Sequence, residues 1–283
     1  MGTATAGAAM NRWGRADFAL CLSLAAGAAL LVAYSGGDFS YHWDFRRAWK
    51  YVVAVDENGG YAPGLLLDGL AASVRLLIFA GALSLLLGAV AAAMLLSPLR
   101  APAVGYVETL RNLPPLVFMF IFFYFAAGDA FDFLGAAIVG DGGFWAQVFL
   151  GDPRRAGNFL GGVVCLAMFE AAFFAEIMRA GVLSVSRGQR DAARSVGLGR
   201  WQTFYLVILP QARKNIAAPL VGQMILLVKD SAILSVISVP ELTFSAQEAS
   251  VSSRRIFEVW LLAAAFYFMI CWPMMHLAQK LER

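Results

Sequence analysis

Charged residues are scarce in this sequence, at 14% of the chain, whereas a soluble domain carries about 25%. Hydrophobic residues make up 60%, which excludes an ordinary water-soluble globule. Histidine is rare as well: His42 and His276 are the two in the chain, and neither has the H-E-x-x-H spacing of a metal site. The three cysteines, Cys21, Cys165 and Cys271, lie in separate apolar stretches without Cys-x-x-Cys spacing. The sequence therefore indicates neither a disulfide framework nor a metal centre.

A strong excess of positive charge is also lacking, since 22 Lys and Arg stand against 19 Asp and Glu for a net charge of +3. That balance gives no reason to expect nucleic acid as a partner. Each of the four lysines follows a residue other than glycine, so the phosphate-binding sequence G-x-x-x-x-G-K-S/T does not occur. We expect no cofactor on this chain. The sequence shows no cluster of a nucleophile and a base, so it gives no support for a membrane enzyme.

Long apolar runs are what the sequence does have. At about 20 residues per bilayer crossing, they predict an all-α membrane protein with six transmembrane helices. The first run follows Arg12 and Arg15 as in a signal peptide, but no small-x-small cleavage site closes it, so we expect a retained helix. The six runs lie at residues 17–34, 65–97, 105–127, 158–180, 215–239 and 256–277.

The distribution of Lys and Arg predicts the orientation, because short cytoplasmic loops carry the excess of positive charge. With the N-terminus in the cytoplasm, 13 of these residues lie on the cytoplasmic side, seven lie outside, and Arg75 and Lys229 fall within helices. We therefore expect both termini in the cytoplasm. Residues 36–64 then form an extracytoplasmic linker. The stretch 128–157 anchors its aromatic residues at the headgroup level, or it covers the outer mouth or docks a partner.

The cytoplasmic segment from Arg179 to Lys214 interrupts the apolar pattern and holds seven of the Lys and Arg residues. Residues 188–197 are typical of a short helix that a glycine ends. Residues 201–210 are amphipathic and predict a second helix that ends at a proline. We expect the two helices, joined at 197–199, to lie along the inner membrane surface.

Small side chains in this segment predict a docking surface. Ala192 and Ala193 leave little bulk, so another protein can approach the backbone closely, and Asp191 is offered to a basic partner. Asp191-Ala192-Ala193, with Gly197 four residues later and Leu209-Pro210 closing the segment, resembles the EAA loop of ATP-binding-cassette (ABC) importer permeases.

Five further stretches look like the polar amino acid branch of that family, and the resemblance covers residues 65–283. They are Arg111–Leu116, Ala175–Gly181, Leu209–Ala212, Lys229–Ser231 and Val239–Leu242. Two positions depart from the family pattern: aspartate replaces glutamate at 191, and Leu113-Pro114-Pro115 replaces the more usual Thr-Pro-Leu. The second departure lies beside the expected pathway and can alter specificity.

The resemblance implies a type I importer of the bacterial inner membrane, with a five-helix permease domain at 65–283 and one extra helix within residues 1–64. It also implies partners: a dimer of cytoplasmic ATPases that bind ATP and Mg, a second permease subunit that is identical or related, and an extracytoplasmic binding protein. The coupling loop 179–214 would receive the ATPase, and its aromatic side chains would bury apolar surface there. The candidate coupling residues are Gly188, Asp191, Ala192, Ala193, Gly197, Trp201, Phe204, Tyr205 and Pro210.

Charged side chains at membrane depth mark a candidate substrate pathway, because each costs about 2.5–3.5 kcal/mol there and needs a partner or water. Glu170 and Lys229 lie at depths that differ by about 9 Å, so they can pair or share an aqueous cavity. Lys229 and Asp230 can point the same way only if the helix breaks at Ser231. Two roles stay open for Glu170: contact with a substrate ammonium, or a buried ion pair that orders the bundle.

Glu176 has a simpler explanation, a local pair with Arg179 three residues later. Arg111 and Asn112 precede Pro114 where a helix enters the membrane, and the proline either frees backbone groups to line a pathway or marks an interfacial start. The candidate pathway residues are therefore Glu170, Lys229, Asp230, Ser231, Arg111, Asn112 and Pro114.

An ion-coupled secondary amino acid transporter is the alternative function, since it too places ionisable residues at the midplane. Such a transporter has an inverted repeat with broken helices in both halves, and residues 17–127 and 158–277 show no such pairing. A purely structural assembly subunit would have no use for the amphipathic cytoplasmic helices.

Overall fold

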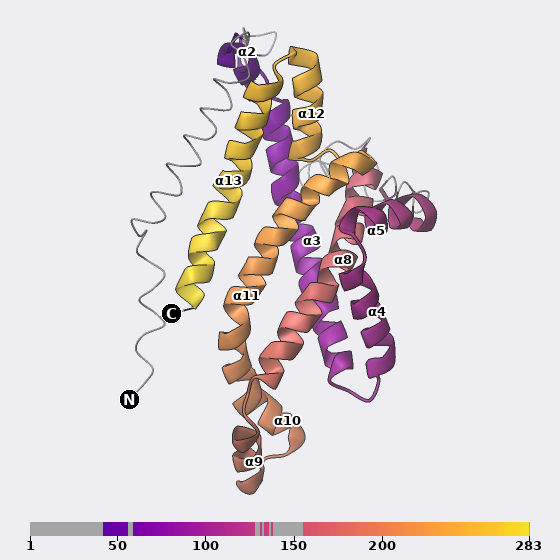
Figure 1. The fold of residues 1–283 in the computed structure, drawn as a ribbon, viewed down its shortest axis with the longest axis vertical. Coiled ribbons are helices and arrows are strands. Elements are labelled where there is room, and N and C mark those ends of the chain that lie inside the picture. Colours follow the sequence, from indigo (N-terminus) through magenta and orange to yellow (C-terminus); the bar gives the residue numbers. More distant parts are fainter. Residues whose placement is uncertain are drawn as a thin grey trace, which may run out of the picture. The chain divides into compact units, whose positions relative to one another are not determined.

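The computed structural model describes a helical protein over residues 42–55, 59–127 and 155–282, with a few positions between 131 and 137. In this described part of the chain, four helices are long and apolar enough to cross a membrane. They are α3 (Leu65–Leu95), α8 (Ala156–Leu183), the stretch Arg200–Ile237 and α13 (Ile256–Leu281) (Figure 1). These helices confirm the spans predicted at 65–97, 158–180, 215–239 and 256–277.

The chain divides into two compact units, Met1–Trp43 and Asp44–Arg283. All the elements described below belong to the second unit. The span predicted at 17–34 lies outside the described residues, as does most of the stretch 128–157.

The span predicted at 105–127 differs in the structure, because the helix breaks at Leu113. Helix α4 (Arg100–Asn112) ends there, and α5 (Pro115–Ile121) continues into the π-helical segment η1 (Phe122–Ala127). Leu113 and Pro114 each precede a proline, a position that disfavours helical angles, and both are extended with ψ of 139° and 134°. The chain therefore turns sharply after α4 (Figure 1).

The stretch Arg200–Ile237 is helical throughout and consists of α10 (Arg200–Thr203), η3 (Phe204–Ile208), α11 (Leu209–Asp230) and η4 (Ser231–Ile237). The prediction that a separate short helix ends at Pro210 is therefore wrong. Pro210 falls in the first turn of α11, where its missing N–H is tolerated. The Leu209 N–H donates to the Phe204 carbonyl across a widened π turn, and Gln211 Nε2 donates to the Val207 carbonyl at 3.1 Å.

Part of the predicted linker forms a small folded element. Helix α2 (Phe45–Trp49) is followed by the antiparallel strands β1 (Val53–Val55) and β2 (Tyr61–Pro63), with Ala54 opposite Ala62. The Asp44 N–H donates to Glu258 of α13 at 2.7 Å, and the Asp44 carboxylate lies 3.7 Å from Arg255. The start of α2 is thereby fixed at the beginning of α13.

Close contact between α3 and α8 forms the centre of the bundle. The small residues that allow this approach are all buried: Gly81, Ser84, Gly88 and Ala92 on α3, and Ala167, Ala171 and Ala175 on α8. A Cβ atom at Gly88 would lie 2.7 Å from the Phe174 Cβ atom and 3.1 Å from the Ala171 carbonyl oxygen. Helices without bulky side chains at such crossings gain the packing that associates them in lipid.

Replacing Gly88 with leucine should force α3 and α8 apart and lower the free energy of unfolding by about 1–3 kcal/mol. The measurement is the melting temperature of the purified protein in detergent. Gly105→Leu is the matched control, because Gly105 on α4 has no atom within 4 Å of a Cβ position. Equal melting temperatures for the two variants would show that the crossing tolerates bulk.

Candidate functional site

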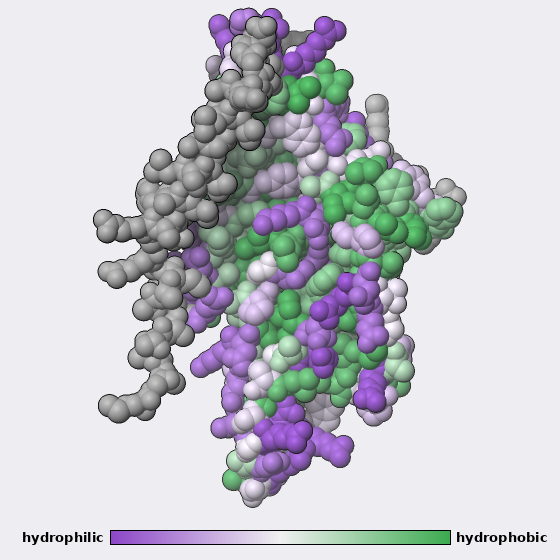
Figure 2. All heavy atoms as spheres, viewed as in Figure 1, coloured by the Kyte–Doolittle hydropathy of each residue, from purple (hydrophilic) through white to green (hydrophobic). Residues whose placement is uncertain are grey.

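The predicted coupling loop forms two short helices that protrude beyond the bundle (Figure 1). Helix α9 (Arg187–Ser195) begins at Ser186, whose Oγ accepts a hydrogen bond from the Gln189 N–H at 3.4 Å. Hydrophilic residues gather at this end of the molecule, as Figure 2 shows. The structure thus places the α9–α10 pair on a polar projection, with α10 continuing into the third span instead of lying as a separate surface helix.

The end of α9 depends on a glycine. Gly197 has a φ of 85°, a left-handed conformation that side chains other than glycine rarely adopt. Its N–H donates to the Arg194 carbonyl at 2.9 Å, and the Leu198 N–H donates to the Ala193 carbonyl at 3.2 Å. These two bonds form a Schellman motif, which ends the helix and directs the chain into α10.

Residues of the predicted docking surface differ in exposure. Asp191 and Ala192 are exposed, whereas Ala193 is buried, and Gly188 has open space around it. Asp191 lies 3.9 Å from Arg194 in an exposed pair that contributes little to stability. Small exposed side chains in this position leave the α9 backbone accessible to a partner.

Exposed aromatic side chains continue this surface along α10 and η3. Trp201 is 74% exposed and Tyr205 is 57% exposed, with their rings stacked at 6.2 Å between centroids. Phe204 is half-buried and contacts Tyr205 edge to face at 5.3 Å. Leu206 is exposed beside them. A contiguous apolar patch on a polar projection is typical of a protein interaction site.

A buried carboxyl lies between α8 and α11. Glu170 is fully buried, and its Oε2 atom accepts a hydrogen bond from Gln223 Nε2 at 2.7 Å. Its Oε1 atom has no hydrogen-bond donor in the described part of the chain. The carboxyl of Asp230 lies close enough to Glu170 for the two groups to interact electrostatically. Two carboxyl groups so close in a bundle interior form a site suited to a cation or a proton.

The structure does not bring Lys229 to this site. Lys229 is exposed and lies near Cys271 of α13, so it and Asp230 point in different directions, as adjacent helical residues must. The helix does not break at Ser231 but tightens into the 3-10 segment η4, and the Ser231 hydroxyl donates to the Val228 carbonyl at 2.8 Å. No ion pair between Lys229 and Glu170 occurs among the described residues.

The remaining candidate pathway residues form a separate group. Arg111 Nη1 lies 4.0 Å from Glu176, which also pairs with Arg179 at 2.6 Å as the sequence predicts. Asn112 Nδ2 donates to the Glu108 carbonyl at 2.7 Å, and Pro114 begins the extended turn after α4. The predicted pathway set is therefore divided between a Glu170–Asp230 site and an Arg111–Glu176 contact.

Gln223 is the functional candidate that the sequence analysis missed. It lies seven residues before Asp230, two helical turns away and on the same face of α11. A search of α11 for polar residues at that spacing would have found it. The spacing alone does not predict that Gln223 contacts Glu170, because that contact depends on how α8 and α11 align.

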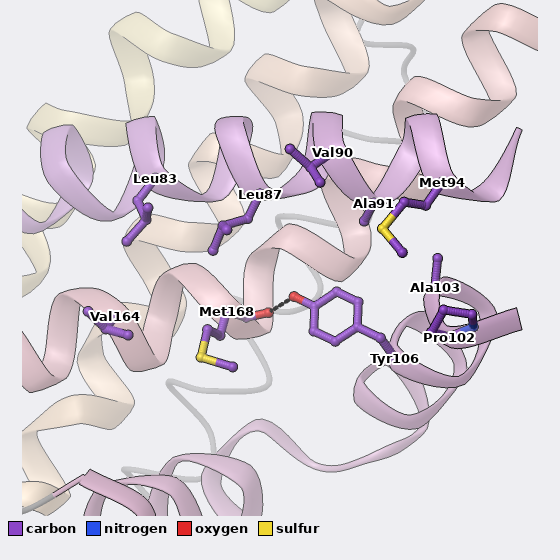
Figure 3. Close-up of a pocket in the computed structure, with 10 residues that line it drawn as sticks. All are labelled: Leu83, Leu87, Val90, Ala91, Met94, Pro102, Ala103, Tyr106, Val164 and Met168. Atoms are coloured by element: carbon purple, nitrogen blue, oxygen red, sulfur yellow. Dashed lines mark hydrogen bonds between the residues drawn. The ribbon is translucent and has the colours of Figure 1, made fainter. Parts of the chain in front are cut away.

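A cavity of about 430 Å³ lies between α3, α4 and α8, apart from these sites. Its lining is almost wholly apolar, with Leu83, Met94 and Ala103 among its residues (Figure 3). The Tyr106 hydroxyl donates to the Met168 carbonyl and is therefore already satisfied. None of the predicted pathway residues lines this cavity, and its chemistry suits hydrocarbon better than an amino acid.

Glu241 organises a second buried polar cluster. Its carboxylate accepts hydrogen bonds from the Tyr267 hydroxyl at 2.6 Å, the Ser73 hydroxyl at 3.4 Å and the Phe244 N–H at 2.8 Å. The last of these bonds caps the N-terminus of α12 (Leu242–Ser253). Burial raises the pKa of the Glu241 carboxyl, and the hydrogen bonds oppose that change. Because every oxygen is bonded, we interpret this cluster as structural.

The described residues contain no group of three or more His, Cys, Asp or Glu side chains that could hold a metal ion.

These features define a polytopic membrane transport subunit: apolar spanning helices, a protruding pair of short helices and a buried carboxyl site. The chain belongs to the family of binding-protein-dependent transport system inner membrane components, whose model matches residues 84–283. This match confirms the family that the sequence resembles. The family is one of transport subunits and not of enzymes.

Relatives of known name agree with this family. The chain is 33% identical over 226 residues to the probable glutamine ABC transporter permease protein GlnM of Bacillus subtilis, covering 77% of this chain and 94% of GlnM. It is 32% identical over 221 residues to the glutamate/aspartate import permease protein GltK of Escherichia coli O6:H1, covering 77% of this chain and 92% of GltK.

A solved structure supports the type I importer fold. The crystal structure of an amino acid ABC transporter with histidines matches with a TM-score of 0.67 and 31% identity, over 86% of this chain and 99% of that one. An inward-facing MetNI methionine ABC transporter shares the fold with a TM-score of 0.58 at 17% identity, over 77% of this chain and 97% of that one.

Proposed function

We propose that this chain is the permease subunit of an ATP-driven importer that moves polar amino acids into the cytoplasm of a bacterium. The observation that carries the proposal is the protruding α9–α10 surface, with Trp201 and Tyr205 exposed beside small residues. Relatives named as glutamine and glutamate/aspartate permeases support the substrate class.

The proposed assembly contains two cytoplasmic ATPases, a second permease subunit and an extracytoplasmic binding protein. ATP and Mg belong to the ATPases, since this sequence has no phosphate-binding loop of its own. The α9–α10 surface faces the cytoplasm, on the side where Lys and Arg are in excess, and both termini share that side. The span predicted at 17–34 would then be a sixth transmembrane helix outside the five-helix core.

The proposed mechanism moves rigid helices. Closure of the ATPase pair brings the two docked α9–α10 surfaces together. The motion passes into the bundle through α8 and through the stretch Arg200–Ile237, because that stretch is helical from the docking surface to its far end. The helices then rock between inward-open and outward-open arrangements, a rigid-body transition between two states.

The buried carboxyls supply a candidate contact for substrate. We propose that Glu170, with Asp230 beside it, contacts the cationic side chain of a passing basic amino acid. The unpartnered Oε1 atom of Glu170 supports this role, because a buried acceptor without a donor is costly unless something binds it. In the competing role Glu170 only orders the bundle, and the substitution Glu170→Gln distinguishes the two roles.

Co-purification tests the proposed function. The permease should retain its ATPase in detergent, and replacing both Trp201 and Tyr205 with alanine should release most of it, because buried aromatic side chains dominate such interfaces. Trp272→Ala is the matched control, since Trp272 is 47% exposed on α13, a helix that contributes nothing to the α9–α10 surface.

Two results would contradict the proposal. An ATPase that stays bound to the double variant would place the docking surface elsewhere. Proton-driven uptake by the permease alone in liposomes would instead favour the secondary transporter.

A further inference from the structure

A charged side chain joins the coupling helix α9 to the end of α8. Arg190 Nη2 donates a hydrogen bond to the Val182 carbonyl oxygen at 2.7 Å. Val182 lies in the last turn of α8, where carbonyl groups have no partner within the helix. A cation at this end of a helix is also stabilised by the helix dipole. The contact therefore holds α9 at a defined place against α8.

The preceding carbonyls of this helix end have other partners. The Ser184 N–H donates to the Ala180 carbonyl at 2.9 Å, and the Ser184 hydroxyl donates to the Gly181 carbonyl at 2.7 Å. Arg190 supplies the donor for the next carbonyl along. Its Nε atom is buried with no hydrogen-bond partner in the described part of the chain. The guanidinium is thus packed into the joint instead of extending into solvent.

The covalent link between α8 and α9 is short and non-helical. It consists of residues 184–186, and a segment of this kind can act as a hinge because no helical hydrogen bond fixes the backbone angles after Ser184. Arg190 lies in the first turn of α9 and reaches back across this link to α8. It therefore restrains the angle between the two helices.

Neighbouring contacts hold α8 against α11 more firmly than they hold α9 against α11. Asn215 Nδ2 of α11 donates to the Ser184 hydroxyl at 2.8 Å, and Ile216 occupies the space that a side chain at Gly181 would need. Gln211 reaches α9 through a neutral bond to Gln189 at 3.4 Å. A charge-assisted bond at 2.7 Å is the stronger of the two restraints on α9.

We propose that Arg190 is a positioning residue that braces the angle between α8 and α9, so that force on α9 rotates α8 instead of bending residues 184–186. This inference rests on the proposed function, because it requires an ATPase that acts on α9. Arg190 itself need not touch the ATPase.

The coupling ratio of the full complex in proteoliposomes tests this role. We expect Arg190→Gln to raise the number of ATP molecules hydrolysed per amino acid transported by about tenfold, the scale of losing one charge-assisted hydrogen bond. The ATPase should co-purify as with the unmodified chain. Arg190→Lys keeps a charged donor and should restore most of the coupling.

Arg187→Gln is the matched control, because it removes the same charge from an exposed position on α9. Its coupling ratio should stay that of the unmodified complex. An unchanged ratio in Arg190→Gln would overturn the proposal, as would release of the ATPase by that variant, which would make Arg190 a docking contact. Failure of the unmodified permease to bind any ATPase would contradict the proposed function instead.

A distance measurement tests the brace without transport. Spin labels on cysteines at Leu183 of α8 and Ser195 of α9, in a chain whose three native cysteines are replaced by alanine, report the angle between the helices. Arg190→Gln should broaden the distance distribution, whereas Arg187→Gln should not. A distribution that stays narrow in Arg190→Gln would show that other contacts hold the joint.

Discussion

Replacing Gly197 with valine should reduce substrate uptake by about tenfold or more while the complex still hydrolyses ATP and inserts into the membrane. Gly197 has a φ of 85°, and a left-handed conformation costs a residue with a side chain about 1–2 kcal/mol. No atom lies within 4 Å of a Cβ position there, so the cost comes from the backbone and not from a clash. The Schellman bonds that direct α9 into α10 would be lost, and the docked surface would no longer be rigid.

Measuring uptake and ATP hydrolysis on the same proteoliposomes checks this prediction. Gly59→Val is the matched control, since Gly59 has a φ of 79° and equally open surroundings but lies in the strand-forming segment far along the chain from α9. Gly197→Asn should be milder, because asparagine tolerates left-handed angles. Uptake in Gly197→Val equal to that of the Gly59 control would contradict the coupling role of this turn.

Replacing Glu170 with glutamine should weaken uptake of amino acids with a cationic side chain by about tenfold relative to neutral ones, the scale of one hydrogen bond to a charged group. Glutamine keeps the shape of the side chain and removes its negative charge. Glu170 is fully buried with one unpartnered oxygen, so no neighbouring cation in the described residues compensates for that charge. Competition between arginine and glutamine, with the cognate binding protein present, gives the measurement.

Glu176→Gln is the matched control for this effect. Glu176 lies on the same helix, but its charge is paired with Arg179. Its substitution should not change the preference between cationic and neutral substrates. A Glu170→Gln variant that loses every substrate to the same extent would assign Glu170 to the ordering of the bundle.

Hydropathy alone predicted the four long spans, because a helix that crosses hydrocarbon must be apolar for about 20 residues. The short helix that ends before Gly197 was also predicted, since a glycine after a helical run is a local pattern that needs no tertiary information. The glycines and alanines of α3 and α8 can be interpreted in the same way, because small residues repeated along one helix face indicate close packing.

Tertiary structure decided the features that the sequence did not predict. A proline usually ends a helix, but at Pro210 a π turn and the Gln211 side chain allow the helix to continue. Glu170 and Lys229 have similar predicted depths, yet rotation of α11 places Asp230 and Gln223 near Glu170 and turns Lys229 away. Depth along a helix is readable from sequence, whereas the facing direction depends on the packed neighbour.

Helices α8 and α11 cross closely where Gly181 meets Ile216, and this crossing lies near the end of α8 that leads into α9. Residues 156–181 extend about 37 Å to one side of this crossing at 1.5 Å per residue. If α8 rotates about this crossing, Ala156 therefore moves along an arc with a radius of about 37 Å. A rotation of α8 that starts at α9 would therefore produce its largest displacement at the opposite end of α8.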